Sequence, residues 1–177
     1  MAFNINEFKS ELTGGGARPT LFQCQVTNPI VPAADFKVPF MARAAGIPES
    51  TIGAYTVPYF GREIKYAGDR TFADWTITII NDEDFIVRNA MEAWMNSIAS
   101  HDANVRTLPQ DYKSNGLITQ YSKDGSSLRS YIFEGMYPIN VSEIAMDWSS
   151  TDQIEEFTVT FQYDFWRVEG STGISTS

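Results

Sequence analysis

The chain has 177 residues and a formal net charge of −9, and its length fits one domain with a substantial hydrophobic core. Its 13 basic residues are scattered, which argues against the clustered Lys and Arg of a tight nucleic-acid-binding surface. We see no apolar run of the roughly 20 residues that a membrane helix needs and expect no secretory signal, while a single cysteine, Cys24, excludes an internal disulfide and fits a reducing compartment.

Residues 1–18 are predicted to form an N-terminal arm. Ile5, Phe8 and Leu12 recur at helical spacing, and three glycines, Gly14 to Gly16, end the segment. A helix this short is unstable alone, so we expect it to dock on the body or on a neighbouring subunit. Because neither a helix nor a Gly-Lys-Ser/Thr sequence follows the glycines, a hinge is favoured over a phosphate-binding loop.

A long structured loop is predicted at 41–58, after two short strands. Pro39, Pro48 and Pro58 disfavour a central strand here, since proline has no backbone N–H to donate. A loop of this length inside a compact domain is usually functional or forms an interface. The two strands before it are predicted at about 20–27 and 35–40.

A β-hairpin and one long helix are predicted in the middle of the chain. The hairpin pairs 60–67 with 73–81 through a turn at 68–70. The helix covers about 82–100, and the acidic residues at 82–84 suit its N-terminal cap and its dipole. Its apolar stripe at i, i+3, i+4 and i+7 consists of Val87, Ala90, Met91, Trp94 and Ile98.

The rest of the chain has the alternation of strands. The last strand buries one face and leaves a polar face, Thr158, Thr160, Gln162 and Asp164. The fold is therefore predicted to be mainly β with one long α-helix, an antiparallel two-sheet β-barrel or sandwich over residues 19–166. The remaining predicted segments are a polar loop at 101–115, strands at 116–123, 129–146 and 154–166, and a flexible tail at 167–177.

Possible catalytic groups have simpler explanations. His101 is the sole histidine and follows the predicted helix, where the dipole favours a cation. Cys24 lies in the middle of a predicted strand, so we interpret it as a strand residue rather than a nucleophile. Asn140 begins a glycosylation sequon, which we interpret as a chance match because no secretion signal is expected.

Two acidic groups could bind a metal or act on sugars. Asp82 to Asp84 could ligate a hard cation, but the calcium-loop pattern is absent and capping explains them. Four acids near the final strands could hydrolyse a sugar in pairs, yet a solvated acidic face explains them better. These are Glu143, Asp147, Glu155 and Glu156. We therefore predict no enzyme, no metal and no cofactor, and keep a β-sandwich ligand-binding module as the alternative class.

Three segments occur in an order that resembles a known family. They are 57–72 (VPYFGREIKYAGDRTF), 75–98 (with INDEDF and RNAMEAWMN) and 136–166 (with VSEI and IEEFTV). Together they are similar to the tail tube protein of contractile-tailed bacteriophages. The same fold occurs in bacteriocin and secretion-system tubes, so a tube of that kind is a second possibility.

The resemblance implies a structural role in the virion. Six subunits would form a ring, and rings would stack into a hollow tube inside a contractile sheath, through which genomic DNA passes into the host. The implied partners are the sheath protein, tube-initiating baseplate proteins, the tape-measure protein and the tail terminator, with no membrane. Assembly would take place in the cytoplasm of the host bacterium.

A ring that stacks needs lateral contacts and a second, axial set. We predict that the arm and the 41–58 loop supply subunit contacts, and that the polar face of the last strand faces the lumen or solvent. A neutral or acidic bore would let DNA slide, because a cationic one would hold it. The predicted interface residues are Ile5, Phe8, Leu12, Phe40, Met41, Ile47, Pro48, Ile52 and Tyr55; the candidate lumen residues are Thr158, Thr160, Gln162 and Asp164.

Overall fold

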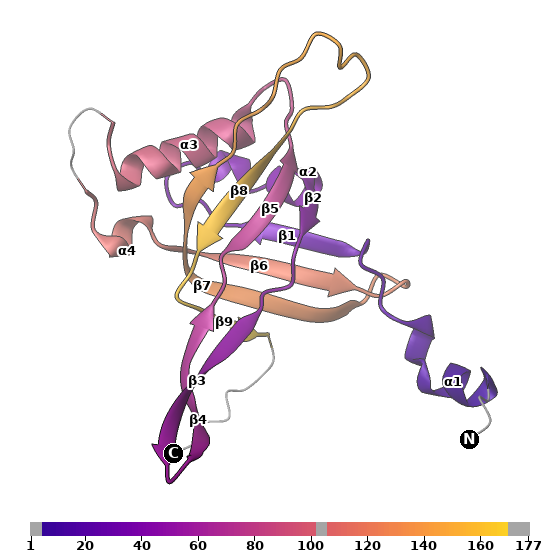
Figure 1. Cartoon of the computed structure of the whole chain (residues 1–177). Helices are drawn as coiled ribbons and strands as arrows, with labels where there is room; N and C mark the ends of the chain where they lie inside the picture. Colours follow the sequence, from indigo (N-terminus) through magenta and orange to yellow (C-terminus); the bar gives the residue numbers. More distant parts are fainter. Residues whose placement is uncertain (1–4, 102–105, 170–177) are drawn as a thin grey trace.

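The computed structural model describes residues 5–101 and 106–169 (Figure 1). The predicted fold class is confirmed, since antiparallel sheets dominate and one helix is long. The helices are α1 (Ile5–Glu11), η1 (Thr13–Gly15), η2 (Pro32–Ala34), α2 (Val38–Met41), α3 (Ile86–Ile98) and α4 (Pro109–Tyr112). The strands are β1 (Phe22–Val26), β2 (Ala42–Ala45), β3 (Ser50–Tyr59), β4 (Arg62–Phe72), β5 (Trp75–Ile80), β6 (Ser114–Tyr121), β7 (Ser127–Val141), β8 (Glu156–Gln162) and β9 (Phe165–Val168).

The long strand β7 joins two antiparallel layers. Its first part pairs with β6 and β9, and its last part, Tyr137–Val141, pairs with β8. The strand order runs β1-β6-β7-β8-β5-β2. No ladder joins β1 to β2 within residues 5–101 and 106–169, so the fold is an open sandwich rather than a closed barrel.

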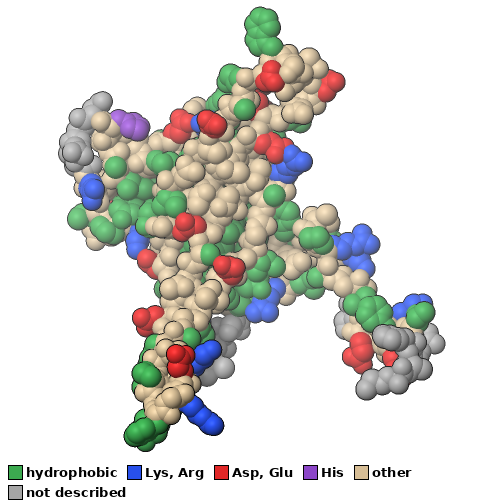
Figure 2. Space-filling model, viewed as in Figure 1, with side chains coloured by type: hydrophobic (Ala, Val, Ile, Leu, Met, Phe, Trp, Pro, Cys, Tyr) green, Lys and Arg blue, Asp and Glu red, His purple; other side chains and the backbone are tan. Residues whose placement is uncertain are grey.

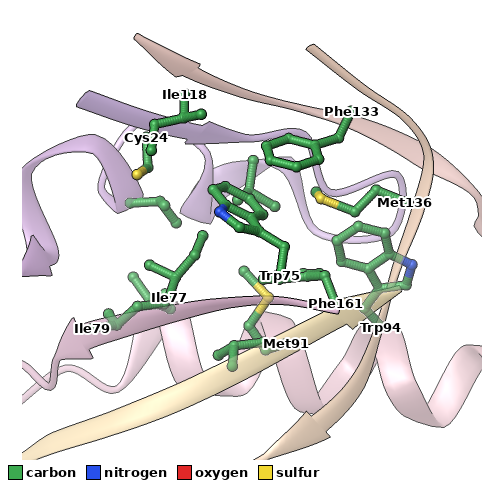
Figure 3. Close-up of a cluster of buried hydrophobic side chains, with 14 of the residues drawn as sticks. Cys24, Trp75, Ile77, Ile79, Met91, Trp94, Ile118, Phe133, Met136 and Phe161 are labelled. Atoms are coloured by element: carbon green, nitrogen blue, oxygen red, sulfur yellow. The ribbon is translucent and has the colours of Figure 1, made fainter. Parts of the chain in front are cut away.

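The hydrophobic core lies between the two layers and under α3. Trp75 stacks on Phe133 with ring centroids 4.2 Å apart, and Phe161 lies beside Trp75 and Trp94 (Figure 3). The indole N–H of Trp94 donates to the carbonyl of Tyr112 at 2.8 Å. The stripe predicted for the helix is correct, because Val87, Ala90, Met91 and Trp94 are buried and Ile98 packs against them.

The predicted loop at 41–58 is wrong, because most of it is strand. β2 pairs with β5, and β3 forms a separate two-stranded sheet with β4 (Figure 1). Pro58 is tolerated near the end of a two-stranded ribbon, where every strand is an edge. The predicted turn at 68–70 is also wrong, since β4 continues through it and the chain reverses at Phe60-Gly61.

Three other boundaries need correction. The strand predicted at 35–40 is instead a turn followed by α2, where Pro39 occupies the first helical turn, a position that suits its fixed φ. The strand predicted at 154–166 breaks at Tyr163–Asp164, so Phe165 begins β9 and is exposed. The predicted tail at 167–177 begins inside β9, and its residues 170–177 lie outside the described residues.

The arm and the helix start are close to the prediction. α1 is followed by η1 and by glycines with positive φ, which fits a hinge. α3 begins at Ile86, and Asp84 accepts the backbone N–H of Ile86 at 3.1 Å, although the residue at the cap itself is Phe85. No helix of the described residues is long and apolar enough to cross a membrane.

Candidate assembly surfaces

Four parts of the surface stand out by shape or by exposed side chains. The hairpin of β3 and β4 projects from one end of the sandwich, and the loop from 142 to 155, here called the β7–β8 loop, projects from the other (Figure 1). The arm with α1 projects sideways. The fourth is the flat polar face of β5 and β8, which points away from the core.

The hairpin has no buried face in the single chain. Every residue of β3 is exposed, and so is nearly all of β4. Its apolar side chains therefore face solvent on both sides, although Tyr55 stacks on Tyr66 at 5.6 Å. A two-stranded ribbon is marginal in water without further packing, which indicates that this hairpin packs against another molecule. The exposed apolar residues of the hairpin are Ile52, Tyr55, Val57, Tyr59, Phe60, Ile64 and Tyr66.

The β7–β8 loop carries exposed apolar side chains among acids. Trp148 is fully exposed, and Met146 and Ile154 are also largely exposed. The backbone N–H and the hydroxyl of Ser149 both donate to Asp147, at 3.0 and 2.7 Å. These bonds hold the pKa of Asp147 below its usual value, so the carboxylate is charged at neutral pH.

The outward face of β5 and β8 is neutral and rich in threonine. Thr76 pairs across the strands with Thr160, with hydroxyl oxygens 3.3 Å apart, and Thr78 pairs with Thr158. Gln162 ends β8 and is exposed. At the other end of this face Arg43 forms a salt bridge with Glu156. The middle of the face therefore has hydrogen-bonding groups and no net charge.

Asp164 lies apart from this threonine face. It follows the end of β8, and the ammonium group of Lys113 donates hydrogen bonds to its two carboxylate oxygens, at 2.7 and 2.8 Å. The hydrogen bond to this carboxylate raises the pKa of Lys113, so its ammonium group is charged at neutral pH. Sequence alternation had placed Asp164 with Thr158 and Thr160, but the bend after β8 ends the alternation.

The nine predicted interface residues lie in three places. Ile5, Phe8 and Leu12 are exposed on the arm, and Ile52 and Tyr55 are exposed on the hairpin. The others lie around α2 and the connection to β3: Phe40 and Ile47 are exposed, Pro48 is half-buried, and Met41 packs against the core. The structure does not bring these three groups together within one chain.

Sequence reasoning missed the two most exposed aromatic side chains, Phe60 and Trp148. Phe60 lies at the tip of the β3–β4 hairpin, whereas the sequence predicts a hairpin with its turn at 68–70. Trp148 lies in DWSST, an aromatic residue among polar turn-forming residues with no strand or helix period. That isolation was the available signal, because a large aromatic outside any amphipathic pattern has no core face to join.

The groups considered for chemistry lie in ordinary environments. Cys24 is fully buried in β1, and burial raises the pKa of its thiol to about 12. His101 is exposed after α3. Lys37 forms salt bridges with both Asp82 and Asp84, so a side-chain cation already occupies the space between these two carboxylates and offsets part of their charge. No group of His, Cys, Asp and Glu within the described parts of the chain has the geometry of a metal site.

Comparison with known proteins gives these surfaces their context. The family model described as "Phage tail tube protein" matches residues 6–169. The chain belongs to the phage tail tube protein family. The tail tube protein gp19 of Enterobacteria phage T4 is 34% identical over 157 residues, which cover 87% of this chain and 93% of that protein. The tail tube protein of Serratia phage KSP90 is 26% identical over 165 residues, 90% of this chain and 93% of that one.

Solved structures agree on the fold of this tail tube protein. The tube-terminating cap of the anti-feeding prophage has a TM-score of 0.64 at 15% identity, with 87% of this chain and 91% of that chain covered. The sheath–tube complex of an extracellular contractile injection system has a TM-score of 0.59 at 14% identity, with 95% and 99% covered. The tail tube protein is therefore a structural component of a virion tail, and its family is not one of enzymes.

Proposed function

We propose that six copies of this tail tube protein form a ring and that rings stack into a hollow tube inside a contractile sheath. The genomic DNA passes through the tube into the host. The observation that carries this proposal is the β3–β4 hairpin, which is exposed on both faces and therefore needs a partner to be ordered. Family membership over residues 6–169 supports another part of the tube as that partner.

Ring closure has suitable surfaces in the open sandwich. β1 and β2 are the ends of the main strand order, and each presents an edge that no strand of residues 5–101 and 106–169 covers. A head-to-tail contact between two different edges generates a ring when its rotation closes. Pairing of strand edges between subunits also removes their tendency to aggregate.

The threonine face is the proposed wall of the bore. Thr158 and Thr160, with Thr76 and Thr78, present neutral hydroxyls, and Gln162 extends this face. DNA carries one negative charge per about 1.7 Å of axis, so a wall with no cation in its middle offers no ionic contacts there that would slow its passage. The excess acidic charge of the chain lies elsewhere, in part on the β7–β8 loop.

The proposed partners are the sheath protein, tube-initiating baseplate proteins, the tape-measure protein and the tail terminator. The baseplate tail-tube junction protein gp54 of phage T4 is 32% identical over 105 residues, which cover 59% of this chain and 32% of that protein. A junction protein with this similarity supports a tube that begins on a related ring at the baseplate. Assembly takes place in the cytoplasm of the host bacterium.

The matched sequence relatives favour a phage tail over a bacteriocin or secretion tube. Injection-system tubes share only the fold, at 13–15% identity in the structures with TM-scores of 0.59–0.64. The phage proteins reach 34% identity over nearly the whole chain. The alternative of a β-sandwich ligand-binding module has no support from these relatives.

Electron microscopy of the purified chain tests the proposal. We expect rings or tubes of uniform width, formed either spontaneously at high concentration or when purified baseplates are added as nuclei. A tube that grows from baseplates only would show that the free subunit waits for a template. Dispersed monomers at high concentration, with no growth on baseplates, would contradict the proposal.

A further inference from the structure

The two projections at opposite ends of the subunit have complementary surfaces. The turn of the hairpin is apolar, with Phe60 91% exposed and Tyr59 packed edge-on against it at 4.7 Å. The β7–β8 loop at the other end is also apolar at its surface, with Trp148 fully exposed. Figure 2 shows hydrophobic side chains at both extremes of the molecule. Monomeric proteins rarely leave such side chains in solvent unless they bind something.

The charges of the two ends are opposite in character. The loop contains Glu143, Asp147, Asp152 and Glu155 and no Lys or Arg. The hairpin contains three cations and two acids. Its cations are Arg62, Lys65 and Arg70, and none of them forms a salt bridge with any residue that the structure describes. The loop is thus an anionic surface, and the hairpin offers unpaired cations close to its apolar tip.

The loop also leaves room for a partner. A groove with a volume of about 1100 Å³ lies between the loop and the adjoining ends of β2, β5 and β8. Its lining combines apolar and acidic side chains with one cation, Arg43, which forms a salt bridge with Glu156. The other lining residues include Ile80, Ile144, Trp148, Asp152 and Ile154. A two-residue turn with aromatic side chains and flanking cations has the shape and chemistry that such a groove accepts.

The conformation of the hairpin tip is unusual for a turn that only reverses the chain. Phe60 has φ 43° and Gly61 has φ 79°, so both central residues are left-handed. Asn or Gly is preferred at the first of these positions, because a bulky side chain is strained there. A phenylalanine that is strained and almost wholly exposed does not stabilise the isolated subunit, and this points to a role in contact.

We propose that the hairpin tip of one copy docks against the β7–β8 loop of a copy in the adjacent ring. Phe60 and Tyr59 pack against Trp148 and the apolar lining of the groove, while Arg62 and Lys65 face the acids of the loop. This contact is heterologous, so it repeats along the axis without closing. The inference rests on the proposed tube and names the two surfaces that join its rings.

Reversal of the loop charges tests the electrostatic part. Glu143→Lys/Asp152→Lys removes two acids that form no salt bridge in the described chain. We expect single rings and at least a tenfold loss of tubes by sedimentation and electron microscopy, an effect of the size that loss of central contacts gives. The control, Asp111→Lys/Glu169→Lys, changes the net charge equally at exposed sites that do not line the groove and should leave the tubes intact.

A charge swap makes the assignment specific. Arg62→Glu/Lys65→Glu should also yield rings without tubes. A chain that carries both the hairpin and the loop reversals should regain tubes, because the opposite charges again face each other. Tubes formed by either reversed variant at the wild-type level would overturn the inference, as would failure of the combined variant when its rings are intact.

Substitution of the tip separates contact from folding. Phe60→Asn places the preferred residue in the left-handed turn, so the melting temperature of the free subunit should be unchanged or higher. Tube formation should nevertheless fall at least tenfold. Normal tube formation by this variant would show that the tip makes no axial contact. If the wild-type chain formed neither rings nor tubes, the proposed function itself would fail, and this outcome is distinct from rings that stack normally despite the substitutions.

Discussion

At the residue scale, Gly135 sets the bend that lets β7 belong to both layers. Its φ is +67°, and a Cβ placed there would lie 2.2 Å from the Asp164 carboxylate. The backbone N–H of Asp164 also donates to the carbonyl of Glu134 at 2.9 Å. The bend between the layers and the turn that leads from β8 to β9 are therefore packed directly against each other.

Gly135→Ala should consequently destabilise the subunit by more than the roughly 1–2 kcal/mol of left-handed strain, because the added Cβ also displaces the Asp164 carboxylate from its salt bridge with Lys113. Gly125→Ala is the matched control, because Gly125 has φ +84° but no atom within 4 Å of its Cβ position. It should lose only the strain, roughly 1–2 kcal/mol. Urea unfolding of the two variants measures the difference, and equal losses would contradict the packing argument.

At the element scale, predictability followed burial. β8 and α3 were recognised from sequence because each buries one face. Burial of one face gives apolar residues a period of two in a strand and of 3.6 in a helix. The β3–β4 hairpin was missed because it buries neither face within the chain, so no period selects for it. Gly68 was interpreted as a turn residue, but it lets strands β3 and β4 approach each other closely at a bulge. A Cβ added at Gly68 would lie 3.3 Å from the backbone of Gly53.

The candidate surfaces were predictable to the same degree. The arm was located because its helical spacing is visible, and Thr158 and Thr160 were assigned to a polar face by alternation. In the β7–β8 loop, sequence reasoning noted only the acids Glu143, Asp147 and Glu155, since a surface that binds another copy has no local period. Its meaning depends on what lies at the opposite end of the subunit, which sequence reasoning does not place.

The joint between α2 and α3 has a pH dependence that can be worked out. Hydrogen bonds from Lys37 are the largest cause that lowers the pKa of Asp82 and of Asp84. A carboxyl group with a lowered pKa stabilises the fold above its unfolded pKa and loses that contribution as the pH falls through its folded pKa. The stabilisation by this joint is thus present at neutral pH and lost in acid.

Lys37→Met should therefore lower the melting temperature slightly at pH 7, since exposed ion pairs contribute little. The difference from the wild type should shrink as the pH falls below 3.8, the ordinary value for both aspartates. Lys65→Met removes a cation without a salt-bridge partner in the described chain and serves as the control. Melting curves from pH 7 to pH 2 that keep a constant difference for Lys37→Met would contradict this account.

At the scale of the whole molecule, the surfaces of the subunit differ in charge. The chain has a net charge of −9, yet the middle of the threonine face is neutral and the acids gather partly on the β7–β8 loop. In the proposed ring of six subunits, any residue on the bore face would be repeated six times, so one added cation per subunit would form a band of positive charge. The bore is thus the surface where a single substitution has the largest electrostatic effect on passing DNA.

Thr160→Lys should slow ejection of the genome without preventing tube assembly, because lysines that contact phosphates bind DNA without regard to sequence. The rate of DNA release from single particles measures this effect, and it should partly recover at higher salt as the charges are screened. Asn89→Lys adds the same charge on the exposed side of α3 and should leave the rate unchanged. Equal rates for the wild type and Thr160→Lys would contradict the placement of the threonine face in the bore.

The two unlike ends of the subunit have a consequence for how a tail acquires its size. A filament built from such units has a direction, and its exposed front is the same whatever its length. Each added subunit therefore binds the same end surface, and this surface does not depend on how many rings are already in the tube. The length of the tube must therefore be set by another component, and one protein that binds the growing end is enough to stop elongation.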